Sequence, residues 1–242
     1  MKLSKRLDIK PGPDETIDAL LDGRLKVIQS RGGYRFSVDA LFLADFVIVR
    51  AGDFLIDLGT GCGVIPLLLL LTTPLHHAVG IEIQPELACQ ASSNIMLNRL
   101  LGKMNILRAD IRHPPLSPGT ADVVTCNPPY RKPNTGRINP NASRAIARHE
   151  ILVSLEDILA TARYLLKAKG RFTTIYSAER LIDLLSQARR FNLEPKRLQV
   201  IYPDMKSSAK LVLVETVLEG NPGLEILPPI LGQGKYAITA PA

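Results

Sequence analysis

The chain has 242 residues, enough for one large α/β domain with a substantial buried core. With 46% hydrophobic and 22% charged residues it is too apolar for a disordered protein, and no apolar run is long enough to cross a bilayer. The three cysteines are far apart and form no CxxC pair, which favours neither a disulfide framework nor a zinc site. We therefore expect a soluble, cytoplasmic protein that holds no metal.

The net charge of +7 is unevenly distributed along the chain. Residues 131–242 hold seventeen basic and ten acidic side chains, whereas the two signs balance before them. An excess confined to one segment favours a positive surface that binds a polyanion such as a nucleic acid. Scattered, solvated side chains would give the same count, because order in the sequence is not position on the surface.

The first fifty residues predict a hairpin and a helix that pack on the domain after them. The run "RLKVIQSRGGYRF" has the pattern of a β-hairpin that turns at Gly32 and Gly33. The run "SVDALFLADFVIV" predicts an amphipathic helix with Ser37 as its N-cap.

From Asp53 onward, short β-rich runs alternate with helical stretches, which indicates a mainly parallel sheet with helices on both faces. A capping box at Ser154 begins a helix that we expect to end near Gly170. Two later runs joined by a polar turn predict an antiparallel pair that closes the sheet. The predicted fold is a doubly wound, seven-stranded, Rossmann-like α/β sheet over residues 51–220, with one antiparallel strand near an edge. The tail, residues 221–242, predicts no element beyond an edge strand.

The segment "IDLGTGCGVIP" places Gly59, Gly61 and Gly63 between a β-rich run and a helical one. Glycines at such a turn let the backbone approach a ligand without Cβ collisions. The dinucleotide pattern G-x-G-x-x-G would need glycine at Val64, so NAD and FAD are disfavoured. G-x-G-x-G after Asp57 instead resembles the motif of S-adenosylmethionine-dependent methyltransferases.

Two further β-rich runs end in an acidic residue. Glu82 is placed to accept both hydroxyls of a ribose, and Asp110 is placed by analogy to receive an adenine amino group. Together with Asp57 they predict a negative pocket. Such a pocket suits a cofactor with a sulfonium and a protonated amine better than it suits a pyrophosphate, because like charges repel.

The run "ADVVTCNPPY" ends a predicted strand with Asn127, two prolines and Tyr130. The Asn127 side-chain oxygen and the carbonyl of Pro128 can accept hydrogen bonds from the two N–H groups of a planar amine as its nitrogen becomes tetrahedral. Pro128 and Pro129 have no N–H and a fixed φ, so they hold that carbonyl in place. Tyr130 offers an aromatic face on which a planar substrate can stack. The motif alone suits an adenine, a cytosine or a glutamine amide.

These motifs, together with "YRFSVDALFLADF" and "GRINPNASRAIARHE", resemble the bacterial tRNA(Val) adenine-N6 methyltransferase family from about Leu20 to Val217. The resemblance implies that residues 51–220 are a catalytic domain that binds S-adenosylmethionine and methylates a tRNA beside the anticodon. It also implies that Asn127, Pro128, Pro129 and Tyr130 hold the target amine. The expected cofactor-binding residues are Tyr34, Phe36, Ser37, Asp39, Asp57, Gly59, Gly61, Gly63, Glu82, Ile83, Asp110, Ile111 and Asn127.

The polar segment directly after the N-P-P-Y motif is rich in basic residues. We expect them to grip RNA phosphates while the target base is turned into the pocket. They are Arg131, Lys132, Arg137, Arg144 and Arg148.

Four other classes of protein are weighed against this family. A protein-glutamine methyltransferase that acts on a translation release factor shares N-P-P-Y, but such enzymes have an extra helical N-terminal domain. Ribosomal RNA guanine-N2 methyltransferases typically carry Phe at the position of Tyr130 and His at the position of Arg131. A DNA adenine methyltransferase would carry a target-recognition domain. A non-catalytic RNA-binding relative would keep the fold, and the intact glycines and Asn127 argue against it.

Overall fold

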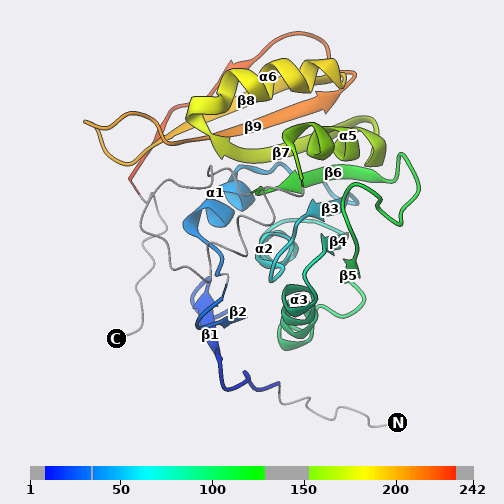
Figure 1. The fold of residues 1–242 in the computed structure, drawn as a ribbon, viewed down its shortest axis with the longest axis vertical. Helices are drawn as coiled ribbons and strands as arrows, with labels where there is room; N and C mark the ends of the chain where they lie inside the picture. The colour runs from blue at the N-terminus through cyan, green and yellow to red at the C-terminus, as the bar shows by residue number, and fades with distance from the viewer. Residues whose placement is uncertain (1–8, 34, 129–152, 233–242) are drawn as a thin grey trace.

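The computed structural model describes residues 9–33, 35–128 and 153–232. They form a nine-stranded sheet and a two-stranded hairpin, with helices around both (Figure 1). The hairpin strands are β1 (Glu15–Leu20) and β2 (Leu25–Ser30). The sheet strands are β3 (Phe54–Leu58), β4 (His77–Glu82), β5 (Met104–Arg108), β6 (Ala121–Cys126), β7 (Leu166–Ser177), β8 (Leu193–Tyr202), β9 (Leu211–Leu218), β10 (Glu225–Ile226) and β11 (Ile230–Leu231). The helices are α1 (Val38–Phe46), α2 (Val64–Thr72), α3 (Pro85–Leu97), α5 (Leu155–Leu165), the short η1 (Ala178–Arg180) and α6 (Leu181–Arg190).

The sheet is mainly parallel, as the alternating sequence pattern predicts. Its order is β10-β8-β9-β7-β6-β3-β4-β5, with β11 also paired to β8. β9 lies between β7 and β8 and is antiparallel to both, which confirms the predicted antiparallel strand near one edge. The tail contributes β10 and β11, two strands of two residues each that pair with β8, so it lengthens the expected seven-stranded sheet.

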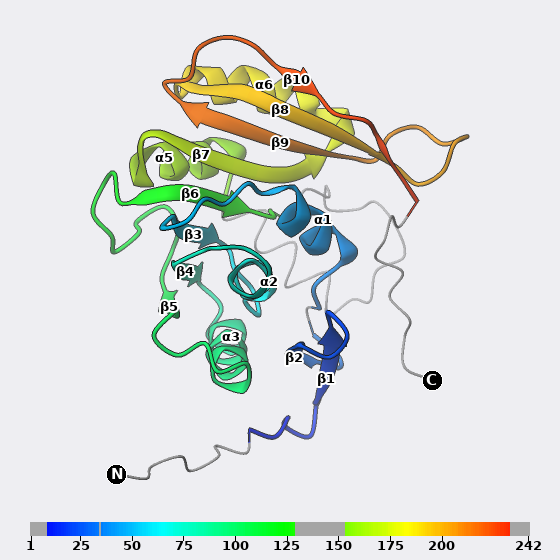
Figure 2. The same cartoon turned by 180° about the vertical axis from the view of Figure 1, so that it is seen from behind.

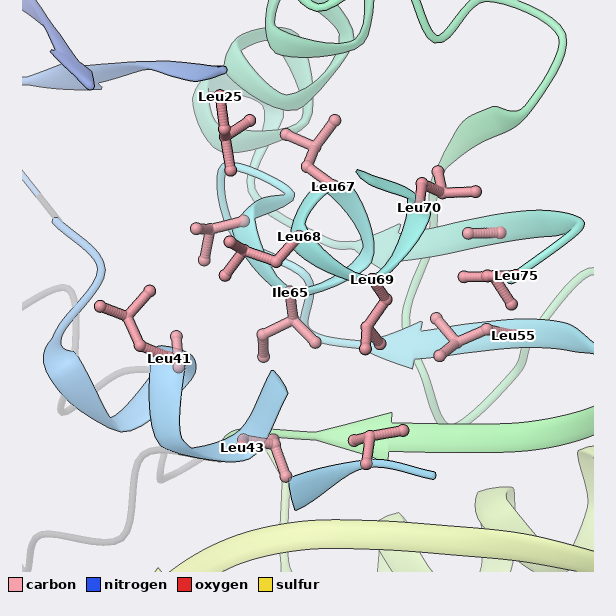
Figure 3. Packing of buried hydrophobic residues seen from close by; sticks show 14 of the residues in the cluster. Leu25, Leu41, Leu43, Leu55, Ile65, Leu67, Leu68, Leu69, Leu70 and Leu75 are labelled. Atoms are coloured by element: carbon pink, nitrogen blue, oxygen red, sulfur yellow. The ribbon is translucent and has the colours of Figure 1, made fainter. Parts of the chain in front are cut away.

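Helices cover both faces of the sheet because successive strand side chains point to opposite sides. On β3, Leu55 belongs to the apolar cluster under α1, α2 and α3, whereas Ile56 belongs to the cluster under α5 and α6 (Figures 1 and 2). Helix α2 is apolar on all sides because it is enclosed between the sheet and the N-terminal elements. Leu67 points toward Leu25 of β2, and Ile65 points toward the sheet (Figure 3). No helix among the described residues is long and apolar enough to cross a membrane.

The prediction that the hairpin turns at Gly32 and Gly33 is wrong, because the turn lies earlier in the chain. Leu20 pairs with Leu25, so the chain reverses at residues 21–24. Asp22 has φ 53° and Gly23 has φ 82°, left-handed values that an Asp-Gly pair adopts at modest cost. Gly32 and Gly33 instead follow β2 and lead the chain toward α1.

The helix predictions are only partly confirmed. The capping box is present, with Asp157 N donating to Ser154 Oγ, but α5 ends at Leu165 rather than near Gly170. The chain turns straight into β7 there, and Lys169 takes a left-handed φ of 62° within the irregular start of that strand. Ser37 is the N-cap of α1, as predicted, although no described backbone N–H of α1 donates to its side chain. Helix α6 is absent from the prediction, although its buried Leu184 and Ala188 have helical spacing.

Asn94 of α3 and Asn98, the C-cap of α3, hydrogen-bond to the backbone of β2 along the edge that faces away from β1. Their side-chain amides bond as the backbone of a neighbouring strand would. Asn94 Oδ1 accepts from Ile28 N (2.6 Å) and its Nδ2 donates to Ile28 O (3.2 Å). Asn98 makes the same pair with Lys26, at 2.9 and 2.7 Å. The match is possible because four helical residues rise about 6 Å, close to the length of two strand residues. Asn94 Nδ2 also donates to Cys62 O (3.0 Å), which ties the hairpin to the glycine-rich loop.

Substituting Asn94 by alanine should lower the free energy of unfolding by about 3 kcal/mol, because three buried backbone groups lose their partner. Asn98→Ala should cost only about 1 kcal/mol, since water can reach the backbone groups of the exposed Lys26. Urea denaturation of both variants measures the difference. Equal losses would contradict the role assigned to Asn94.

Candidate active site

The parallel register brings the predicted ligand-binding residues to one edge of the sheet. Leu58, the last residue of β3, lies opposite Ile81 of β4 and Cys126 of β6. Glu82 lies opposite Arg108, the last residue of β5. The residues that follow these strand ends are therefore neighbours although up to 68 positions separate them in the chain. This is the edge at which open α/β sheets bind ligands.

The glycine-rich loop follows β3 and leads into α2. Gly59, Gly61 and Gly63 have φ values of 67°, 58° and 84°, so each adopts the left-handed conformation that favours glycine. The N–H groups of Gly59 and Thr60 both donate to Ile81 O, at 2.9 and 3.0 Å, which holds the loop against β4. A Cβ on Gly59 would meet no heavy atom within 4 Å, so the loop has open space there for a ligand.

Glu82 is buried at the end of β4 and supports the loop. Its Oε2 accepts from Gly61 N (2.9 Å) and its Oε1 accepts from Gln84 N (2.9 Å). Each carboxylate oxygen can accept more than one hydrogen bond, so these contacts leave capacity for the hydroxyls of a ribose. Glu82 thus positions the glycine-rich loop and lies at the edge of the sheet where the cofactor is predicted to bind.

Asp57 lies one layer below, inside β3. Thr125, its register partner on β6, donates to Asp57 Oδ1 (2.7 Å). Burial raises the pKa of Asp57 to about 6, against the lowering effect of the Thr60 and Thr125 hydroxyls, and the charge of Glu82 raises it further. The Thr60 hydroxyl lies near enough to Asp57 to lower its pKa, but within the described residues neither Asp57 Oδ2 nor Thr60 Oγ1 has a hydrogen-bond partner of ordinary distance and angle. Both atoms are buried, and a cation held nearby would lower the cost of the Asp57 charge.

Asp110 follows β5 and has an ion pair with Arg112, whose Nη2 lies 2.6 Å from Asp110 Oδ2. This contact lowers the pKa of the Asp110 carboxyl. An adenine amino group would compete with Arg112 for the carboxylate. Of the two isoleucines among the expected cofactor-binding residues, Ile83 is half-buried and Ile111 is buried.

Asn127 and Pro128 follow β6, directly beside the glycine-rich loop. Cys126 O accepts from Thr174 Oγ1 of β7 (2.8 Å), which fixes the strand end that carries them. Asn127 is half-buried and Pro128 is buried. The predicted residues outside the described part of the chain are Tyr34, Pro129, Tyr130, Arg131, Lys132, Arg137, Arg144 and Arg148.

The N-terminal segment approaches the same loop from the side. Phe36 is half-buried and packs against the apolar cluster that contains Cys62 and Val64. Ser37 is exposed and Asp39 is half-buried. Sequence reasoning did not single out Thr125, Asn94 or Gln29, three buried polar residues that support this region; their signal is a polar residue inside an otherwise apolar run.

The methyltransferase small domain model matches residues 38–184, more than half of the chain. The chain belongs to the methyltransferase small domain family. The match spans α1, the glycine-rich loop, Glu82, Asp110, the N-P-P-Y motif and α5, and it ends within α6. The resemblance that the motifs suggest is thereby confirmed at the level of the family.

Curated relatives from this family carry a specific name. A tRNA1(Val) (adenine(37)-N6)-methyltransferase of Porphyromonas gingivalis is 31% identical over 66% of this chain and 64% of its own length. The chain thus spans 64% of that relative. A protein of the same name from Aliivibrio salmonicida is 24% identical over 76% of this chain and 77% of its own length.

Solved structures share the fold. A protein described as a predicted O-methyltransferase from Agrobacterium tumefaciens has a TM-score of 0.65 at 18% identity, covering 83% of this chain and 90% of its own. A geranyl diphosphate C-methyltransferase from Streptomyces coelicolor, solved with S-adenosyl-L-homocysteine, has a TM-score of 0.58 at 15% identity. The match covers 74% of this chain and 76% of that protein's chain. The predicted doubly wound, Rossmann-like methyltransferase fold is confirmed.

The raised pKa of Asp57 makes the stability of this family member depend on pH. Between about pH 4 and about pH 6 the folded chain without ligand holds a proton that the unfolded chain has lost. The free energy of unfolding therefore falls as the pH rises through this window, by up to about 3 kcal/mol.

Asp57→Asn should abolish this dependence, because an amide can still accept from Thr125 but does not ionise. Urea denaturation of both proteins should give nearly equal free energies at about pH 4 and the largest advantage for the variant at about pH 7. Parallel curves for the two proteins would show that Asp57 does not titrate in this window.

Proposed function

We propose that this chain is an S-adenosylmethionine-dependent methyltransferase that methylates the exocyclic N6 amine of an adenine in structured RNA, namely a tRNA near the anticodon. The observation that carries the proposal is the position of Asn127 and Pro128, which follow β6 directly beside the glycine-rich loop that follows β3. A methyl donor and an amine acceptor bound at adjacent strand ends are within reach of each other.

The described residues fit S-adenosylmethionine, which when bound supplies an electrophilic methyl group on a positively charged sulfonium. Open space at Gly59 admits the ligand to the loop backbone. Glu82 has acceptor capacity for ribose hydroxyls. The buried carboxylate of Asp57 would be stabilised by the positively charged end of the ligand.

The amine of the substrate would be held by the residues that follow β6. Asn127 Oδ1 and the carbonyl of Pro128 accept hydrogen bonds from its two N–H groups. These bonds stabilise the positive charge that develops as the nitrogen becomes tetrahedral. Pro129 adds no competing N–H, and Tyr130 stacks on the base, an interaction of about 1 to 3 kcal/mol. This role for the four residues rests on their sequence and on the placement of the first two.

The choice of RNA rests on charge and on relatives. The positive excess of the chain lies after Tyr130, beginning with the five basic residues of the segment 131–148 that we propose to contact phosphates. The curated relatives are named for tRNA1(Val) and for N6 of adenine 37. A structured RNA is therefore preferred to a protein substrate.

The deciding experiment supplies labelled S-adenosylmethionine with total tRNA, ribosomal RNA and a translation release factor in parallel, followed by nucleoside analysis. We expect label in tRNA as N6-methyladenine. Label in the release factor alone would support a protein-glutamine methyltransferase instead. Binding of RNA without binding of the cofactor would indicate a non-catalytic relative.

Asn127→Ala should lower turnover by about 100-fold while leaving the affinity for S-adenosylmethionine nearly unchanged, because the amine loses its side-chain acceptor whereas the glycine-rich loop and Glu82 still hold the cofactor. Calorimetry measures the affinity, and single-turnover methyl transfer measures the rate. Asn105→Ala, which changes an exposed asparagine on the edge strand β5, is the matched control and should alter neither quantity. Retained turnover in Asn127→Ala would exclude this mechanism.

A further inference from the structure

Gln29 is a buried polar residue that none of the proposed roles uses. It lies on β2 with 1% of its surface exposed. Its Nε2 donates to Asp18 Oδ2 (2.6 Å), and its Oε1 accepts from Phe36 N (2.8 Å). Both ends of the amide are therefore occupied, and Gln29 joins strand β1 to the segment that leads into α1.

Arg35, the residue before Phe36, is held by the same hairpin. Its guanidinium forms an ion pair with Asp18. It also donates to Thr16 Oγ1 (2.9 Å) and to Ser30 O (3.3 Å). Two consecutive residues of the connection are thus fixed, one through its side chain and the other through its backbone N–H.

The fixed segment lies beside the glycine-rich loop. Asn94 Nδ2 bridges the carbonyls of Ile28, the residue before Gln29, and Cys62, a residue of the loop. Phe36 packs against the apolar cluster that includes Cys62. Movement of the segment 35–37, between β2 and α1, would therefore change the contacts beside the glycine-rich loop.

We infer that Gln29 is a positioning residue for the cofactor site: by holding Phe36 N and Asp18 together, it keeps the segment 35–37 against the glycine-rich loop. The inference rests on the proposed function, since the ligand it concerns is the proposed cofactor. In this role Gln29 acts through Phe36, whose backbone N–H it holds, and through Asp18. Its removal should weaken cofactor binding more than it slows chemistry.

The test compares Gln29→Met, which keeps the size of the side chain but loses both hydrogen bonds, with the unaltered protein. Calorimetry with S-adenosylhomocysteine should show a Kd raised about tenfold, equivalent to about 1.4 kcal/mol. Turnover at saturating cofactor should stay within about twofold of the original. Without any ligand, amide hydrogen exchange at Phe36 should become faster, because its N–H loses a buried acceptor.

A pair of substitutions separates the two hydrogen bonds. Gln29→Glu keeps an acceptor for Phe36 but sets a carboxylate against Asp18, so its affinity should also fall. Adding Asp18→Asn supplies an amide donor in place of that carboxylate and should restore much of the lost affinity. If Gln29→Met does not fold, this single and double variant carry the test.

Asn98→Ala is the matched control, because it removes two hydrogen bonds from the other end of β2 without touching Phe36. It should lower stability but leave the Kd unchanged. Equal Kd values for Gln29→Met and the original protein, or an equal rise in Asn98→Ala, would overturn the inference. If the original protein binds no cofactor, the proposed function fails as well, and the hydrogen-exchange result shows separately whether Gln29 holds Phe36.

Discussion

The main-chain hydrogen bonds that pair β3 with β4 and β6 determine where every candidate ligand group can lie. Because the three strands are parallel and in register, Leu58, Ile81 and Cys126 lie side by side, and whatever follows each of them opens onto the same edge. A shift of one residue in either pairing would turn alternate side chains to the opposite face. A shift in the β3–β6 pairing would also separate Asp57 from Thr125. The position of the site is thus a consequence of sheet register, and the site residues need no direct contact with one another to be brought together.

That arrangement places two buried carboxylates, Asp57 and Glu82, close to this edge of the sheet. Two backbone N–H groups donate to Glu82, whereas Asp57 Oδ1 accepts from the Thr125 hydroxyl and Asp57 Oδ2 has no partner of ordinary hydrogen-bond geometry among the described residues. Buried charge without partners costs free energy, and here part of that cost falls on the ligand-free state. A cation bound near Asp57 would remove some of that cost, which agrees with the positively charged cofactor that we propose.

The N-terminal hairpin is joined to this edge by side-chain amides rather than by strand pairing. Asn94 and Asn98 pair with the edge of β2 that faces away from β1, and Gln29 connects β2 to the segment before α1. An amide has both a donor and an acceptor, so it can satisfy a backbone N–H and C=O together. Open strand edges invite pairing with other chains, and covering β2 with helix α3 removes that hazard while holding the hairpin against Cys62.

The sequence alone predicts the sheet, the glycine-rich loop and the residues at the strand ends, because alternating apolar runs and closely spaced glycines are local signals. It could not place the hairpin turn at Asp22 and Gly23, end α5 at Leu165, or show that Asp110 is paired with Arg112. Those outcomes depend on which backbone groups and charges meet in space. Only the tertiary structure showed that Thr125 partners Asp57 across 68 residues and that Gln29 holds Phe36, since a polar residue inside an apolar run gives no sign of its partner until the strands are packed.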